Sequence, residues 1–72
     1  MSEKHFQIKN GENFMTLNVL LKLSGLIDTG GMAKAFLANN AVFVNGEAEN
    51  RRGRKLYRGD SVLIGKDTFV VD

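Results

Sequence analysis

The Asn45-Gly46 pair is the feature of this sequence that most narrowly constrains how the chain folds. A two-residue type I′ hairpin loop needs positive φ at both central residues, and Asn-Gly accepts this geometry most readily. The β-rich residues Ala41–Val44 lead directly into the pair. We therefore predict a hairpin whose returning strand is Glu47–Asn50. Side chains alternate along a strand, so either the two valines or the phenylalanine of the first strand faces outward, and the sequence leaves this choice open.

A first helix is predicted from Thr16 to about Ser24. Thr16 is a suitable N-cap residue, and Gly25, after the last turn, suits a left-handed C′ position. Apolar side chains recur at helical spacing over a wide arc of this segment, which indicates burial. These side chains are Leu17, Leu20 and Leu21, with Val19 and Leu23 beside them.

A second helix is predicted over about Gly30–Asn39. Asp28 and Thr29 can both act as its N-cap residue. Asn40, at the other end, is a residue type that accepts left-handed backbone geometry. The apolar side chains of this helix are expected to face the core, and they are Met32, Ala33, Phe36 and Leu37.

Short strands are predicted near both ends of the chain, over His5–Ile8, Ser61–Ile64 and Thr68–Val71. The resulting order β-α-α-β-β-β-β predicts an α+β fold, in which two short helices pack on a small, curved, mostly antiparallel sheet. The N-terminal strand is expected to join the C-terminal strand at one edge. Residues 1–72 are expected to form one domain, because 72 residues leave no room for a second core. Four phenylalanines are expected in the core: Phe6, Phe14, Phe36 and Phe69.

The residue types present exclude several kinds of site. The sequence has no Cys and a single His, His5, which excludes disulfides, cysteine nucleophiles and zinc sites built from Cys or His clusters. Its eight acidic residues are scattered, and no nucleophile–base pair is evident. We therefore expect a protein that is not an enzyme and has no catalytic residues, metal, cofactor or small-molecule substrate.

The sequence shows neither a membrane span nor a secretion signal. Its longest purely apolar runs are three or four residues, whereas a transmembrane helix needs about 20. The first residues lack the basic-then-apolar order of a signal peptide. We therefore expect a cytoplasmic protein with no membrane partner.

Positive charge is concentrated in residues 51–58, called the basic segment below. The segment contains all four arginines of the chain and no acidic residue, whereas the net charge of the whole chain is only +2. Like charges so close together repel one another, and an anionic partner would relieve that repulsion. The cations of the basic segment are Arg51, Arg52, Arg54, Lys55 and Arg58.

Arginine is suited to nucleic acid, because its guanidinium binds phosphate oxygens bidentately and stacks on unpaired bases. We predict that the five cations of the basic segment contact RNA. Residues 51–55 are expected to form an exposed loop or a frayed strand. In an extended segment Arg52 and Arg54 would share one face and Arg51 and Lys55 the other. Two alternatives stay open: a solvated loop that keeps the domain soluble, and a module that docks this loop on an acidic protein.

The start of the second helix is a further candidate for phosphate binding. Free N–H groups at a helix N-terminus can bind phosphate, and Gly30 and Gly31 would let a nucleic-acid backbone approach closely. Lys34 would lie one turn farther along, within reach of the same phosphate. The pattern is not a P-loop, because Gly-Lys-Ser/Thr is absent. Simple helix capping beside a solvated Lys34 is the alternative.

From Thr16 to Val62 the chain resembles the S4-type RNA-binding domain. The shared features are a Leu-rich first helix followed by Gly and an apolar residue, a capping Thr, an early Ala in the second helix, a V-x-V-N-G hairpin and a later G-D-x-V strand. In this sequence they are Leu17, Leu20, Leu21, Gly25-Leu26, Thr29, Ala33, Val42-Phe43-Val44-Asn45-Gly46 and Gly59-Asp60-Ser61-Val62. Gly30 stands where many S4 domains have an RNA-contacting Arg, whereas Lys34 retains the next basic position of the family.

The whole chain is most similar to the small stand-alone S4 proteins of bacteria, the YaaA/YbcJ-like group. The resemblance implies the αL motif of S4 domains, RNA binding without a catalytic domain, and a link to ribosome maturation. The implied partner is structured RNA, namely ribosomal RNA or a precursor in large-subunit maturation, bound by a monomer. Under the protein-docking alternative, the acidic partner would be a ribosome-associated factor.

Overall fold

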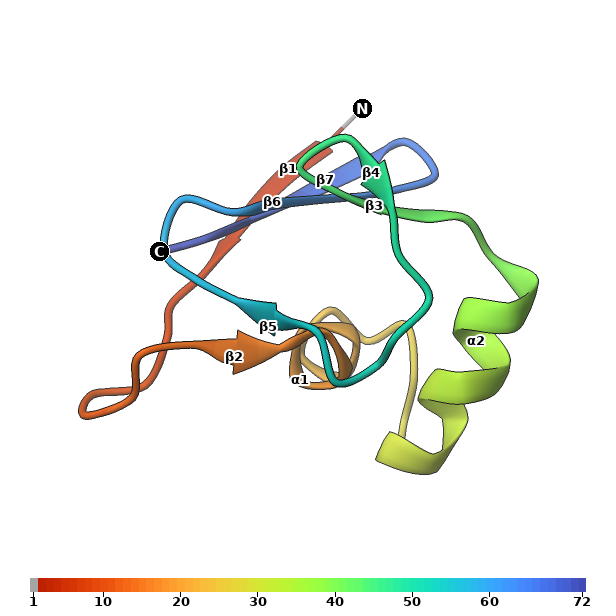
Figure 1. The fold of residues 1–72 in the computed structure, drawn as a ribbon, viewed down its shortest axis with the longest axis horizontal. Helices are drawn as coiled ribbons and strands as arrows, with labels where there is room; N and C mark the ends of the chain where they lie inside the picture. The colour runs from red at the N-terminus through yellow and green to blue at the C-terminus, as the bar shows by residue number, and fades with distance from the viewer. Residues whose placement is uncertain (1) are drawn as a thin grey trace.

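A computed structural model describes residues 2–72, which form a five-stranded sheet, a two-stranded sheet and two α-helices, the second preceded by a 3₁₀ turn, η1 (Figure 1). In chain order the elements are β1 (Ser2–Phe6), β2 (Met15–Thr16), α1 (Leu17–Leu23), η1 (Gly30–Met32), α2 (Ala33–Asn39), β3 (Val42–Val44), β4 (Glu47–Ala48), β5 (Lys55–Leu56), β6 (Ser61–Ile64) and β7 (Asp67–Val71). Neither α-helix of residues 2–72 is long and apolar enough to span a membrane.

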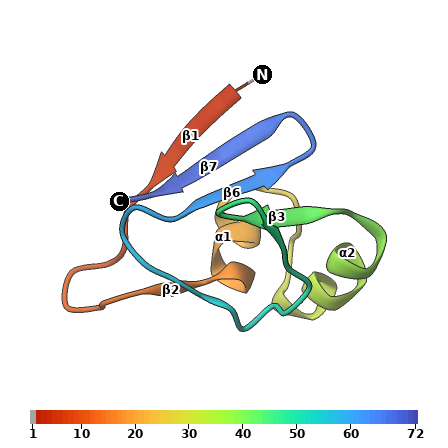
Figure 2. The ribbon, with the colours of Figure 1, turned by 45° about the horizontal axis from the view of Figure 1, so that its top comes forward.

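The larger sheet has the strand order β1-β7-β6-β3-β4 and is antiparallel except for the parallel pair of β1 and β7. The predicted edge pairing of the first and last strands is therefore confirmed, as is the α+β class. In Figure 1 the larger sheet lies at the top, α1 and the β2–β5 sheet lie below it, and α2 closes the right-hand side. Figure 2 shows the same arrangement from a second direction.

The core is formed by the inner face of the larger sheet, α1 and parts of β5 and α2. In β3 the valines are buried and Phe43 is partly exposed, so the valines face inward. This settles the alternation that the sequence left open. The buried apolar side chains are Ile8, Met15, Leu17, Leu20, Leu21, Ile27, Ala33, Leu37, Val42, Val44, Leu56, Val62, Ile64, Phe69 and Val71.

The predicted Asn-Gly hairpin is confirmed, with φ of 52° at Asn45 and 86° at Gly46. The Asn45 side chain also holds the start of β6: its Oδ1 accepts from the Ser61 backbone N–H at 3.0 Å, and its Nδ2 donates to Asp60 Oδ1 at 3.1 Å. The other oxygen of Asp60 accepts from the Tyr57 backbone N–H at 2.8 Å. Two turns distant in sequence are therefore tied together by side-chain hydrogen bonds.

The ends of α1 follow the sequence prediction. Thr16 Oγ1 accepts from the Val19 backbone N–H at 3.3 Å, which makes Thr16 the N-cap residue. Gly25 has a φ of 82°, the left-handed conformation that favours glycine after a helix.

The second predicted helix is wrong in three details. Gly30–Met32 is a 3₁₀ turn and the α-helix begins at Ala33, because Thr29 makes no side-chain cap hydrogen bond. Met32 lies in that turn and is 45% exposed, so it does not face the core. Asn40 has an extended backbone, with a φ of −134°, and ends the helix by donating from Nδ2 to the Phe36 carbonyl at 3.0 Å.

Strand limits also differ from the prediction. The first strand is β1 rather than His5–Ile8, although the Ile8 N–H still bonds the Asp72 carbonyl beyond it. The returning hairpin strand is only β4, since the chain turns after Glu49. Phe69 is a core residue, and Phe6 stacks on it with ring centroids 5.8 Å apart. Three of the four phenylalanines expected in the core are only partly buried: Phe6, Phe14 and Phe36.

His5, on the edge strand β1, lies between two carboxylates. Its Nε2 is 3.0 Å from Glu3 Oε2 and its Nδ1 is 2.9 Å from Asp72 Oδ2. The hydrogen bonds to Glu3 and then Asp72 raise the pKa of His5 above its usual 6.5. Protonated His5 is therefore favoured in the folded state, and its stabilising contribution is complete below pH 6.5 and is lost as the pH rises through the higher folded pKa.

We predict that the difference in melting temperature between the wild type and His5→Gln is larger at about pH 5.5 than at about pH 9. Following the His5 ring protons by NMR measures the imidazole pKa directly. A titration midpoint at or below 6.5 would contradict the ion-pair geometry.

Candidate nucleic-acid interface

The basic segment is held against the start of α1 by backbone hydrogen bonds. The Leu17 N–H donates to the Arg54 carbonyl and the Asn18 N–H to the Arg52 carbonyl, both at 2.9 Å. These bonds continue the pairing of β2 with β5, and they satisfy N–H groups that a helix start leaves without intrahelical partners. Of the two expectations for residues 51–55, the exposed loop is therefore confirmed for residues 51–54, and the frayed strand is wrong because the backbone is hydrogen-bonded to a helix.

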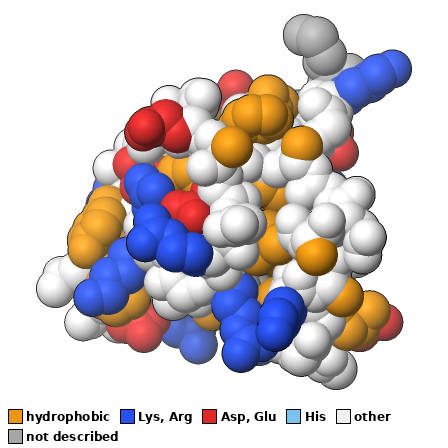
Figure 3. All heavy atoms as spheres, turned by 45° about the vertical axis from the view of Figure 1, so that its right-hand side comes forward, with side chains coloured by type: hydrophobic (Ala, Val, Ile, Leu, Met, Phe, Trp, Pro, Cys, Tyr) orange, Lys and Arg blue, Asp and Glu red, His pale blue; other side chains and the backbone are white. Residues whose placement is uncertain are grey.

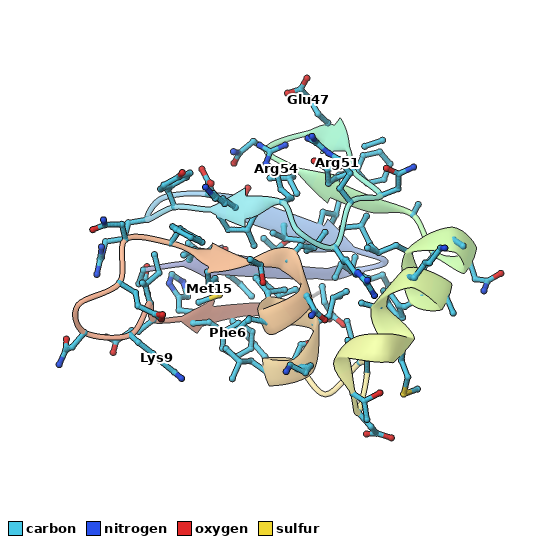
Figure 4. All side chains as sticks on the ribbon, turned by 60° about the horizontal axis from the view of Figure 1, so that its bottom comes forward. Phe6, Lys9, Met15, Glu47, Arg51 and Arg54 are labelled. Atoms are coloured by element: carbon cyan, nitrogen blue, oxygen red, sulfur yellow. The ribbon has the colours of Figure 1, made fainter. Side chains whose placement is uncertain are left out.

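Residues 51–54 form a turn, in which the Arg54 N–H donates to the Arg51 carbonyl at 3.2 Å. A turn brings its first and last residues to the same side. The expected alternation of an extended segment is therefore wrong, since Arg51 and Arg54 point toward the same group rather than to opposite faces. Figure 4 shows these two side chains close together beside β4, on the opposite side of the view from Lys9.

The group that Arg51 and Arg54 both contact is the carboxylate of Glu49, whose side chain is only 6% exposed. Oε2 accepts from the Asn50 and Arg51 backbone N–H groups and from Arg51 Nε, each at 3.1 Å. Oε1 accepts from Arg51 Nη2 at 3.1 Å and from Arg54 Nη1 at 2.9 Å. These donors, led by the Arg51 guanidinium, lower the pKa of Glu49 to about 2, so the carboxylate is charged at neutral pH.

Sequence reasoning missed Glu49 and counted it among scattered acids. The signal in the sequence that could have revealed the role of Glu49 was the register of the hairpin strands. A two-residue loop pairs Val44 with Glu47, so Glu49 lies opposite Val42 on the buried face, where its N–H bonds the Val42 carbonyl at 2.8 Å. An acid at a buried strand position requires partners, and the arginines that follow it are those partners.

The remaining cations of the basic segment are exposed. Among residues 2–72 no ion pair joins Arg52 or Arg58 to an acidic side chain. Lys55 Nζ lies 4.9 Å from the centre of the Phe14 ring, a cation–π contact. Figure 3 shows Lys and Arg side chains gathered on one face of the molecule, with acidic side chains among them.

Gly30, at the start of η1, lies next to this segment through Asn18. The Asn18 backbone bonds Arg52, and its side-chain nitrogen is 3.1 Å from the place where a Cβ of Gly30 would be. Lys34 is exposed on the first turn of α2. One residue of each predicted set, Gly30 and Arg52, therefore adjoins the same asparagine.

A shallow hollow of about 420 Å³ lies over the basic segment. Its lining consists of Arg51, Gly53, Arg54, Lys55 and Tyr57. Three cations and one aromatic ring thus surround a depression with no acidic residue in its lining, a surface that attracts anions. Within the described residues, no three His, Cys, Asp or Glu side chains are placed to hold a metal ion.

We predict that Glu49→Gln lowers the free energy of unfolding by about 1–3 kcal/mol near pH 7, because charged hydrogen bonds to both arginines are lost. A carboxylate with a lowered pKa stabilises the fold above its unfolded value of 4.5, and this contribution is lost as the pH falls toward about 2. Denaturant unfolding should therefore show wild type and variant converging across that interval. Glu47→Gln, at an exposed position of β4, is the matched control. Equal effects of the two substitutions would contradict the assigned role.

We predict that Gly31→Ala raises the free energy of unfolding by about 0.4–1 kcal/mol, because it restricts the unfolded chain and its Cβ meets only Thr29 Oγ1, at 3.9 Å. Gly30→Ala should be less stable than Gly31→Ala, since its Cβ must displace the Asn18 side chain. Thermal unfolding of the two variants checks the order. The reverse order would show that Asn18 does not restrict position 30.

Comparison with known proteins identifies the family of this chain. The S4 domain family matches residues 6–72. The "Probable ribosome maturation protein RlbA" of Bacillus subtilis (strain 168) is 58% identical over 58 residues, which cover 79% of this chain and 82% of the relative. No solved structure matches this chain significantly. The family match spans both predicted helices, the Asn-Gly hairpin and the basic segment, and the chain therefore belongs to the S4 domain family.

Proposed function

We propose that this chain is a non-catalytic RNA-binding protein that docks on structured ribosomal RNA through its basic segment. The observation that carries the proposal is a group of exposed cations on a backbone that is fixed by hydrogen bonds. The backbone of the segment is fixed to α1 by hydrogen bonds, and Arg52 and Arg58 have no acidic partner among the described residues. Membership of the S4 domain family supports RNA as the ligand.

The proposed mechanism is phosphate binding by two exposed arginines beside two arginines that are already held in place. Arg52 and Arg58 displace counterions from the RNA backbone, which drives binding by counterion release. Arg51 is 73% exposed although its guanidinium bonds Glu49, so it still presents N–H groups to solvent. Arg51 and Arg54 lose little conformational freedom on binding, because Glu49 already holds them. Lys55 adds a fifth charge beside them.

Lys34, Gly30 and Gly31 form the second part of the proposed interface. Gly30 adjoins the basic segment across Asn18, and both glycines lack a side chain that would hold an RNA backbone away. In this arrangement Lys34 contacts a phosphate one turn along α2 and fixes the orientation of the RNA. With Gly30 in place of the family Arg, the basic segment carries most of the charge.

The proposed process is ribosome maturation in the cytoplasm, in which the whole chain acts as one domain and as a monomer. The name of the B. subtilis relative, a probable ribosome maturation protein, supports this process for a chain 58% identical to it. The proposed ligand is therefore ribosomal RNA of a maturing large subunit.

We predict that the wild type binds purified ribosomal RNA with log K falling against log salt at a slope of about −3.5 to −4.5, as expected for about five neutralised phosphates. The double variant Arg52→Ala, Arg58→Ala should reduce the magnitude of this slope by about 1.5–2, without loss of melting temperature. The matched control Lys4→Ala, Lys66→Ala removes the same charge from exposed positions on β1 and the β6–β7 turn. Equal slopes for both double variants would contradict the assigned interface.

Sedimentation of cell lysate through a sucrose gradient tests the ribosomal partner with the same variants. The wild type and the control are expected to migrate with a ribosomal subunit or precursor, and the Arg52, Arg58 variant to remain at the top. Wild type at the top of a low-salt gradient would contradict ribosomal docking.

A further inference from the structure

We propose that Tyr57 stacks on an unpaired base of the bound RNA, so that the ligand is a paired stem with an unpaired nucleotide beside it. This inference rests on the proposed function and names the class of RNA that the same surface selects. It assigns sequence-tolerant stacking to one aromatic ring, whereas the arginines bind phosphates.

The position of the Tyr57 ring follows from the register of β2 and β5. Met15 pairs with Leu56, and both side chains are buried. The next pair outward is Phe14 with Tyr57, which therefore lies on the opposite, solvent-facing side. The two rings are in contact, with centroids 6.0 Å apart and planes inclined by 55°. Tyr57 is 49% exposed, a large fraction for an aromatic side chain of so small a protein.

The Tyr57 ring stands on a rigid backbone. Its own N–H donates to Asp60 Oδ2 at 2.8 Å, and its carbonyl accepts from the Asp60 N–H at 3.0 Å. The Gly59 N–H, two residues after Tyr57, donates to the Val71 carbonyl at 2.8 Å. A base that stacks on this ring therefore pays little ordering entropy on the protein side.

The surroundings of the ring favour a nucleotide over other ligands. Tyr57 forms one wall of the shallow hollow, and the rest of the lining is Arg51, Gly53, Arg54 and Lys55. Gly53 has open space where a Cβ would be, so this part of the lining carries no side chain that would fill the hollow. Lys55 is placed over the neighbouring Phe14 ring. A ligand that suits an exposed ring among cations carries a flat aromatic group and negative charge together, which is the chemistry of a nucleotide in a single strand.

The test compares a fully paired stem with the same stem carrying one bulged purine, which adds only a single phosphate. We expect the wild type to bind the bulged stem at least about fivefold more tightly, since stacking on an aromatic side chain is worth about 1–3 kcal/mol per base. Tyr57→Leu should lose this preference and keep the affinity for the paired stem. Tyr57→Phe should retain it. Phe43→Leu, a partly exposed aromatic on the outer face of the larger sheet, is the matched control and should also retain it.

A fluorescent 2-aminopurine at the bulged position supplies a second measurement that needs no variant. The wild type should quench its fluorescence there and leave it unchanged when the probe is paired in the stem. Equal affinity of the wild type for both RNAs, or an equal loss for both in Tyr57→Leu, would overturn the stacking role while leaving phosphate binding intact. Failure of the wild type to bind either RNA would overturn the proposed function and this inference together.

Discussion

The buried carboxylate of Glu49 is the interaction on which the form of the basic surface depends. Without it, five cations within eight residues would repel one another, and the Arg51 and Arg54 side chains would have no common anchor. With it, Arg51 and Arg54 are drawn to one point and the turn between them is closed. A buried charge is tolerated here because five donors satisfy both oxygens. Two arginines thus serve the fold, and this frees Arg52 and Arg58 to face a ligand.

A second constraint joins the two most recognisable motifs of the chain. The hairpin Asn45 bonds both Asp60 and the backbone of Ser61, and Asp60 in turn holds the backbone of Tyr57. The V-x-V-N-G and G-D-x-V motifs therefore act as one structural unit, although fifteen residues separate Asn45 from Asp60. The basic segment lies between these two motifs in sequence. Tyr57, near its C-terminal end, is fixed by the same network that fixes the hairpin, and this contributes to the order of a highly charged loop.

Most of the fold could be predicted from the sequence, because the signals were local. The Thr16 cap, the leucines of α1 and the Asn-Gly loop each specify their own backbone geometry. What could not be predicted depended on tertiary contacts. Met32 has helical spacing but lies in a 3₁₀ turn at the surface, and Asn40 uses its side chain, not a left-handed backbone, to end α2. Glu49 was the largest omission, since its role appears only when the hairpin register is carried one residue past the end of β4.

The candidate site was less predictable than the fold, because its charge pattern did not reveal which cations are free. Composition placed all five in one class. The structure separates Arg51 and Arg54, bound to Glu49, from Arg52 and Arg58, and sets Lys55 on an aromatic ring. Gly30 fits the same division of roles. Its lack of a side chain leaves room for Asn18, which bonds the basic segment and links it to η1. A side chain at position 30 would have to share space with the Asn18 amide, whereas residues 51–58 carry their cations on exposed positions, so in this chain the basic segment and not the start of the second helix presents most of the charge.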